Sequence, residues 1–206
     1  MPSHKLTYFN LRGRGEIIRL IFAAAGAEYT DERVEFSEWP NLKPNAPLGQ
    51  LPYLTIDGSV HIPQSMAIAR YVARETGLAG KTNLEQAQAE AIVETIMDVV
   101  NYYWANIFKI EDANEKAEAF KSFLLDQGAK GAKSVEKLVG LYGSNGHAVG
   151  DSLTWADLAI YDVASALLAK HPEFSDKFPA FAAIYKNVIA NENISNYVKN
   201  RPETPF

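Results

Sequence analysis

Cysteine is absent from the 206 residues of the chain. Its absence excludes disulfide bonds, cysteine-ligated zinc and cysteine nucleophiles together. The four histidines are scattered along the chain without the spacing of metal ligands, so the sequence predicts no metal site. A chain without cysteine is also compatible with a reducing compartment.

Positive charge and long apolar runs are scarce as well. The formal net charge is −5 at pH 7, and no cluster of lysine or arginine offsets it, which argues against a nucleic-acid partner. No stretch approaches the roughly 20 apolar residues of a membrane span. Residues Met1–Lys5 show no apolar core of a signal peptide. We therefore expect a cytoplasmic protein that binds neither nucleic acid nor membranes.

Apolar residues make up 47% of the chain, which is ordinary for a globular protein. The N-terminal part mixes strand and helix signals, whereas the remainder shows helical periodicity without a clear strand. Residues 77–81 (GLAGK) have the composition of a linker. The sequence predicts an α/β domain over residues 1–79 and an all-α domain over residues 82–206, each of an ordinary domain size.

The N-terminal part predicts a strand over residues 5–10 and a strongly apolar helix over 16–25, which Gly26 is expected to end. A second strand is predicted over 29–34, and an irregular helix or loop over 39–47, where three prolines occur. A strand, helix and strand in succession imply a right-handed parallel crossover. Since a hairpin follows, we expect parallel and antiparallel pairing within one small sheet.

Residues 51–75 (LPYLTIDGSVHIPQSMAIARYVARE) predict a strand, a tight turn, a second strand and a helix. Asp57-Gly58 favours a hairpin because glycine takes the positive φ of the preferred turns. Ser65 is the expected N-cap of the helix. A helix N-terminus beside the free backbone of Leu51 would suit a short extended peptide that carries a carboxylate.

The helical part predicts one long helix over about residues 83–110 and a second over about 112–142. Gly128 and Gly131 interrupt the second helix, which predicts a bend or a close approach of two helices. Further helices are expected over residues 158–168, 178–190 and 194–199. The predicted N-caps are Thr82, Asp112 and Thr154.

Several polar residues occupy positions where chemistry could occur, although each has an ordinary structural explanation. Tyr8 ends the first strand, where α/β sheets bind ligands, yet by position alone it is a core or rim aromatic. A turn arginine such as Arg14 is usually solvated. Glu90, Glu94 and Asp98 form an acidic stripe along one helix face. Such a stripe is a solvated surface, a contact for a cationic partner or a weak site for a divalent cation.

A set of short motifs is distributed over the whole chain. They are Lys5-Leu6-Thr7-Tyr8-Phe9-Asn10, Arg12-Gly13-Arg14, Trp39-Pro40, Gly49-Gln50-Leu51-Pro52, Gln64-Ser65 with Ala67-Ile68-Ala69-Arg70-Tyr71, and Gly150-Asp151-Ser152-Leu153-Thr154-Trp155-Ala156-Asp157. Together they make the chain resemble the cytosolic glutathione transferases, and most closely the sigma class, which includes the haematopoietic prostaglandin D synthases. The resemblance implies a thioredoxin-like domain followed by an all-α domain, in a homodimer.

The resemblance also implies roles for individual residues. Tyr8 would be the catalytic tyrosine, whose hydroxyl donates to the sulfur of glutathione and favours the thiolate, which is the nucleophile. Arg14 would support Tyr8, and Leu51 before a cis Pro52 would pair with the peptide backbone. The implied glutathione-binding residues are Tyr8, Trp39, Lys43, Gly49, Gln50, Leu51, Pro52, Gln64, Ser65 and, across the dimer, Asp98 of the partner subunit. The implied second-substrate pocket, much of it in the helical domain, is lined by Phe9, Arg14, Val100 and Trp104.

The implied function is attack of the glutathione thiolate on small hydrophobic electrophiles, a detoxification reaction with glutathione as co-substrate. Two alternatives stay open, a glutathione-dependent prostaglandin D isomerase and a non-catalytic binding protein of the ligandin or crystallin type. Tyr8, which a non-catalytic relative need not keep, argues against the binding protein. Glu94 and Met97 stand where the prostaglandin synthases present two further acids, so no metal is expected.

Overall fold

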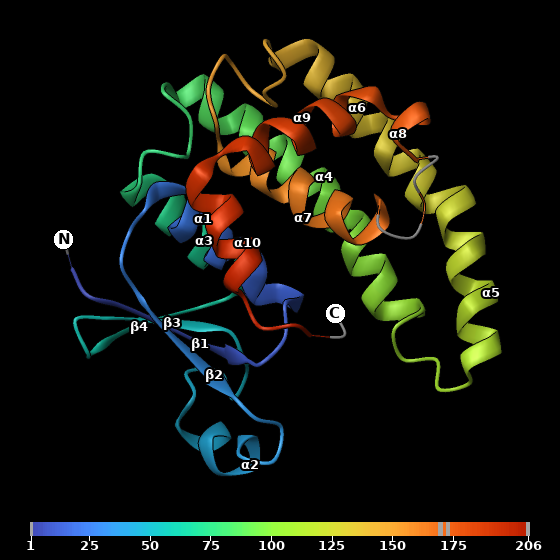
Figure 1. Cartoon of the computed structure of the whole chain (residues 1–206). Coiled ribbons are helices and arrows are strands. Elements are labelled where there is room, and N and C mark those ends of the chain that lie inside the picture. The colour runs from blue at the N-terminus through green and yellow to red at the C-terminus, as the bar shows by residue number, and fades with distance from the viewer. Residues whose placement is uncertain (1, 169–170, 172–173, 205–206) are drawn as a thin grey trace. The chain divides into compact units, whose positions relative to one another are not determined.

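The computed structural model describes residues 2–168, 171 and 174–204. They form two compact units (Figure 1). The first unit comprises the residues up to Ala79 together with those from Ile189 onward, and the second comprises Gly80–Val188. The domain limits expected from the sequence stay a prediction. The structure adds that the C-terminal helix belongs, by its packing, with the N-terminal unit.

The first unit is built on a four-stranded mixed sheet with the strand order β2-β1-β3-β4. β1 and β2 are parallel, and the other two pairs are antiparallel, as the order of elements predicts. Leu6 of β1 faces Leu54 of β3, and both side chains are fully buried in the core. The strands are β1 (His4–Phe9), β2 (Thr30–Val34), β3 (Tyr53–Ile56) and β4 (Val60–Pro63).

Helix α1 (Glu16–Ala25) is the central helix of this unit and packs against α3 (Ser65–Glu75) and α10 (Glu192–Asn200). In Figure 1 the red α10 lies beside the blue α1, although nearly the whole chain separates them in sequence. Gly26 ends α1 with φ 60°, the left-handed conformation expected of a glycine cap. The remaining elements are a 3₁₀ turn at Gly13–Gly15, the short helix α2 (Trp39–Leu42) and a 3₁₀ turn at Lys43–Asn45.

The second unit is built of helices. The predicted helix over residues 112–142 is in fact two helices joined by a π-helical turn, Leu124–Gly128. The first predicted helix ends at Asn106, earlier than expected, and the short helix α8 was not predicted. The helices are α4 (Asn83–Asn106), α5 (Ala113–Phe123), α6 (Ala129–Tyr142), α7 (Trp155–Leu168), α8 (Phe174–Lys177) and α9 (Pro179–Ala190). Among the described residues, no helix is both long and apolar enough to cross a membrane.

The N-caps of the helical unit agree with the sequence. Thr82 accepts a hydrogen bond from the backbone N–H of Glu85 at 3.1 Å, and Asp112 accepts from the N–H groups that begin α5. The Thr154–Asp157 pair lies in the core, where the Asp157 carboxylate accepts from the Thr154 N–H and hydroxyl, both at 2.8 Å. The Thr82 and Asp112 side chains satisfy backbone donors that the first turn of a helix leaves without partners, and Asp157 satisfies the N–H of the residue before its helix.

Gly131 of α6 permits a close approach to α4. A Cβ atom at this position would lie 2.2 Å from Cγ2 of Val99, far inside van der Waals contact. The absence of a side chain at Gly131 therefore allows two helices to approach closely, which is one of the two explanations that the sequence offered for this glycine. Gly140, in the same helix, has open space around the corresponding position.

We expect Gly131→Ala to destabilise the helical unit by about 1–3 kcal/mol, because the added methyl group overpacks the contact with Val99. Gly140→Ala should stabilise it by about 0.5–1 kcal/mol, since alanine is the better helix former. Urea unfolding followed by circular dichroism measures both changes. Equal effects of the two substitutions would contradict the close contact.

Candidate active site

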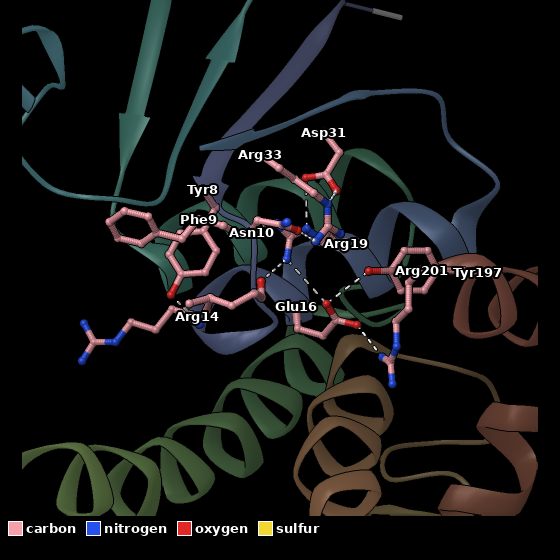
Figure 2. Close-up of polar contacts among 11 residues, drawn as sticks. Tyr8, Phe9, Asn10, Arg14, Glu16, Arg19, Asp31, Arg33, Tyr197 and Arg201 are labelled. Atoms are coloured by element: carbon pink, nitrogen blue, oxygen red, sulfur yellow. Dashed lines mark hydrogen bonds and ion pairs between the residues drawn. The ribbon is translucent and has the colours of Figure 1, made fainter. Parts of the chain in front are cut away.

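Tyr8 lies near the end of β1, and its side chain is buried against the turn that follows. Its hydroxyl oxygen accepts a hydrogen bond from the backbone N–H of Arg14 at 3.0 Å (Figure 2). Because the phenol oxygen is the acceptor in this bond, its own proton remains available for a second partner. Figure 2 shows the Arg14 guanidinium directed away from the phenol, so the backbone makes the direct contact.

The environment of Tyr8 keeps the phenol neutral. Burial raises the pKa of Tyr8, while the Arg14 N–H and the charges of Arg14 and Arg19 act in the opposite direction. The net shift is upward from the ordinary value for tyrosine. At neutral pH the Tyr8 hydroxyl therefore keeps its proton and can donate a hydrogen bond to a ligand atom beside its oxygen.

Gly13 and Gly15, which have no side chains, allow the turn to lie in close contact with the Tyr8 ring. A Cβ at Gly15 would lie 2.5 Å from Cδ1 of Tyr8, and one at Gly13 would lie 2.7 Å from the hydroxyl oxygen. Gly13 also has φ +39°, in the left-handed region that glycine tolerates best. Any side chain at Gly13 would therefore displace the phenol oxygen or the turn.

Gly13→Ala is expected to lower kcat about tenfold or more, because a small displacement of a reacting group has a large effect on rate. Gly58→Ala is the matched control. Gly58 also has a positive φ, +71°, but nothing lies within 4 Å of the added atom. Both variants should lose about 1 kcal/mol of stability from backbone strain. Gly13→Ala should lose more, because its added atom overlaps Leu11 and Tyr8, and only Gly13→Ala should lose activity. A loss of activity in both would mean that strain alone is responsible.

A pocket in the same unit brings together five of the ten predicted glutathione-binding residues. The Leu51-Pro52 peptide bond at its edge is cis, as expected. Arg14 lines this pocket and also donates its N–H to Tyr8, so the pocket and the phenol share one residue. Leu48 and Pro63 line it as well, and neither was predicted. The lining residues are Arg14, Leu48, Gln50, Leu51, Pro52, Pro63, Gln64 and Ser65.

The start of α3 differs from the prediction. Ser65 is the first residue of the helix, and the N-cap is Gln64, which makes no side-chain capping bond. The Ser65 cap was therefore wrong by one position, because Gln64 adopts an unusual backbone conformation with φ 75° and ψ 113°. A glutamine in this region is strained, and such strain is typical of ligand sites. The first N–H groups of α3 still favour an anion at this point.

Other predicted residues of this unit lie outside the lining of the pocket. Trp39 packs edge-on against Phe9, with ring centroids 5.7 Å apart. Phe9 also stacks on the exposed Phe36 at 4.6 Å. Lys43 lies beside Gly49, where a Cβ would be 3.7 Å from the lysine Cε. The roles of Trp39, Lys43, Gly49 and Phe9 toward ligands stay predictions.

Three further predicted residues, Asp98, Val100 and Trp104, belong to α4 in the helical unit. Trp104 packs on Phe108 with ring centroids 4.2 Å apart, within a group of aromatic side chains. The roles of these three residues toward glutathione and a second substrate also stay predictions. In the part of the chain that the structure describes, no three His, Asp or Glu side chains are grouped to hold a metal ion.

Sequence reasoning missed a fully buried arginine behind Tyr8. The guanidinium carbon of Arg19 lies 5.8 Å from the centre of the Tyr8 ring. Arg19 donates to the Leu11 carbonyl at 2.6 Å and pairs with Asp31 at 3.0 Å. The signal in the sequence is a charged pair, Glu16 and Arg19, within an otherwise apolar helix. Its partners, however, lie on other elements and could not be identified from the helix alone.

Comparisons with known proteins show the family to which the chain belongs. Two family models match, "Glutathione S-transferase, N-terminal domain" over residues 4–74 and "Glutathione S-transferase, C-terminal domain" over residues 97–201. The hematopoietic prostaglandin D synthase of Gallus gallus is 45% identical over 99% of both chains. A probable glutathione S-transferase 7 of Caenorhabditis elegans is 39% identical over the full length of both. A solved sigma class transferase of Fasciola hepatica superposes with a TM-score of 0.88 at 31% identity, covering 100% of this chain and 99% of that one. The chain therefore belongs to the glutathione S-transferase family, with relatives in its sigma class.

Proposed function

We propose that the protein is a glutathione transferase that activates glutathione as its thiolate for attack on small hydrophobic electrophiles. The observation that carries the proposal is the neutral, buried Tyr8 phenol, whose oxygen is held by the Arg14 N–H. The same Arg14 lines a pocket with the N-terminus of α3, whose N-cap Gln64 makes no side-chain capping bond. A γ-glutamyl peptide in this pocket would place its carboxylate at the helix and its sulfur toward Tyr8.

The energy required of Tyr8 is modest. Lowering a thiol pKa by about two units takes roughly 2.7 kcal/mol of preferential stabilisation of the anion. A hydrogen bond to a charged group contributes about 1.5–3 kcal/mol. One well-placed phenol is therefore sufficient in magnitude, and the Arg14 and Arg19 charges act in the same direction as the phenol.

The remaining residues fill out the proposed reaction. Gln64 and Ser65 would hold the γ-glutamyl carboxylate, and the Leu51 backbone would pair with the cysteinyl unit. Trp39, Lys43, Gly49 and Gln50 would reach the glycyl end. A second substrate would lie against Phe9, Arg14, Val100 and Trp104.

Assembly and location follow from the same proposal. We expect a cytoplasmic homodimer in which Asp98 of the partner subunit completes the glutathione site. Sedimentation at micromolar concentration tests the dimer. A monomer that turns over glutathione would remove the role proposed for Asp98.

Turnover of an aryl halide with glutathione is the direct test of the proposed function. We expect saturable kinetics for the native chain, and weaker glutathione binding by calorimetry for Gln64→Ala than for the native chain. Binding of glutathione without turnover of any electrophile would favour a binding protein instead. That alternative has support from a relative named S-crystallin 2 of Enteroctopus dofleini, which is 35% identical over its full length.

A prostaglandin D isomerase is the second candidate, because four of the similar proteins are named hematopoietic prostaglandin D synthase. Incubation with the endoperoxide and glutathione decides it. Formation of a D-type prostaglandin would add this activity, and its absence would remove it, while the transferase proposal stands on the aryl halide alone.

A further inference from the structure

Arg19 is the centre of a buried network of charges behind Tyr8 (Figure 2). Its guanidinium makes three hydrogen bonds and one further ion pair. Nε pairs with Asp31 at 3.0 Å, and Nη1 lies 3.6 Å from Glu16. The other two bonds go to backbone carbonyls, from Nη1 to Leu11 at 2.6 Å and from Nη2 to Phe9 at 3.4 Å. A fully buried arginine with this many partners holds a single orientation.

The two carbonyls belong to the segment that leaves β1 directly after Tyr8. The Leu11 N–H also donates to the Phe9 carbonyl at 2.8 Å, which closes this segment into a turn. The next residues form the Gly13–Gly15 turn, which supplies the Arg14 N–H for the Tyr8 hydroxyl. Arg19 therefore fixes the segment between Tyr8 and Arg14, whose backbone N–H orients the Tyr8 phenol.

The C-terminal segment holds the other end of the network. The buried Glu16 carboxylate accepts from the Tyr197 hydroxyl at 3.1 Å and from Arg201 Nη1 at 2.6 Å. Burial raises the pKa of Tyr197, and Glu16 adds to the shift, so this hydroxyl stays a neutral donor. Glu16 thus has partners that fix its position beside Arg19.

The network carries an excess of positive charge. Three guanidinium groups, those of Arg19, Arg33 and Arg201, face two carboxylates, those of Glu16 and Asp31. Each arginine faces a carboxylate, and the group as a whole carries one surplus positive charge. The Arg19 guanidinium lies close to the phenol, with its carbon 5.8 Å from the centre of the Tyr8 ring. A buried cation at this distance favours an anion at the far side of the phenol, since screening is weak in the interior.

We infer that Arg19 is a positioning residue for the reaction of Tyr8, and that Tyr197 and Arg201 hold it in place through Glu16. The inference depends on the proposed function, since Tyr8 must act on a thiol for its position to affect a rate. Arg19 touches no substrate in this proposal. It fixes the turn that carries Tyr8, and it places a positive charge behind the ring.

The alternative is a network that only stabilises the fold. Both explanations predict that loss of Arg19 lowers stability, because it leaves Glu16 and Asp31 buried without their partner. They differ in the acidity of the bound thiol. A purely structural network leaves that acidity unchanged in any variant that still folds.

Arg19→Lys is the main test, because lysine keeps the charge but has no planar guanidinium to reach all of these partners at once. The thiol of glutathione bound to the enzyme is titrated by the ultraviolet absorbance of the thiolate. We expect its pKa to rise by about half a unit or more, which lowers kcat about threefold at pH 6.5 and much less at pH 9. The KM for glutathione should change less than about twofold.

Arg201→Met is the second variant, should Arg19→Lys fail to fold. Arg201 is at the edge of the network with a partly exposed side chain, and its loss weakens the hold on Glu16. We expect the same direction of change. Lys5→Met is the control, since Lys5 forms an exposed ion pair with Glu32 on the same strand as Tyr8 but is no part of the network. It should titrate as the native protein does.

The outcomes separate this inference from the proposed function. Native thiol acidity in the folded Arg19→Lys or Arg201→Met variant, with Tyr8→Phe strongly impaired, overturns the inference alone. Native activity in Tyr8→Phe overturns the role of Tyr8, whatever the arginine variants do. A raised thiol pKa in the arginine variants and a native value in Lys5→Met supports the inference.

Discussion

Tyr8→Phe is expected to lower kcat for glutathione transfer by about 100-fold or more. The phenol is the single side-chain donor proposed for the developing thiolate, and loss of one such donor typically costs a factor of about 10²–10³ in kcat. Glutathione affinity should change less than about threefold, because the pocket residues remain. Steady-state kinetics with an aryl halide and calorimetry with glutathione measure the two quantities separately.

Tyr53→Phe is the control for this result. Tyr53 lies on β3 in the same sheet, and its ring packs edge-on against His61, away from the Tyr8 hydroxyl contacts. Its kinetics should match those of the native chain. The rate of Tyr8→Phe should recover in part at high pH, where the thiol ionises without help. A native kcat in Tyr8→Phe at neutral pH would remove the proposed role of the phenol.

Asp157→Ala has the largest expected effect on stability, about 3–5 kcal/mol. Asp157 is fully buried and accepts hydrogen bonds from the N–H groups of Ala148 and Thr154, at 2.7 and 2.8 Å, and from the Thr154 hydroxyl. Alanine would leave two buried backbone donors without an acceptor, the Thr154 N–H at the start of α7 and the Ala148 N–H in the loop before it. Denaturant unfolding followed by circular dichroism measures the loss, and low solubility of the variant would be consistent with it.

Asp112→Ala is the comparison, because the Asp112 carboxylate also accepts two backbone N–H groups at the start of a helix, here as the N-cap of α5. Asp112 is exposed and accepts from the N–H groups of Asn114 and Glu115. Water can replace its carboxylate, so we expect a loss of only about 1 kcal/mol. Equal losses of stability at the two positions would show that burial does not increase the contribution of the Asp157 hydrogen bonds to stability.

Local signals were sufficient for the elements that position the site. The bounds of α1 agree with the sequence because an apolar run is followed directly by Gly26, a residue that takes the left-handed cap without strain. The hairpin was predicted because Asp57 and Gly58 both accept positive φ, and they do so here at 48° and 71°. These features depend on neighbours within a few residues, which periodicity and turn chemistry describe well.

Features that depend on distant residues were not predictable from such signals. Gln64 has a positive φ, which residues other than glycine rarely adopt, so its residue type does not predict this conformation. The π-helical turn at Leu124–Gly128 appears in the sequence only as a glycine within a helix. Asp31, the partner of Arg19 on β2, and Tyr197, the partner of Glu16 on α10, are distant in sequence, and a local pattern contains no information on which distant side chain will be met.

The packing of α10 on α1 has a consequence for the order in which the molecule can be completed during synthesis. Glu16 emerges from the ribosome early, whereas Tyr197 and Arg201, which bind its carboxylate, are added only after the helical unit. Until they arrive, a nascent N-terminal unit exposes to water a carboxylate that the finished protein buries. The sheet unit therefore reaches its final form only after the whole helical unit has been made, although it is first in the sequence.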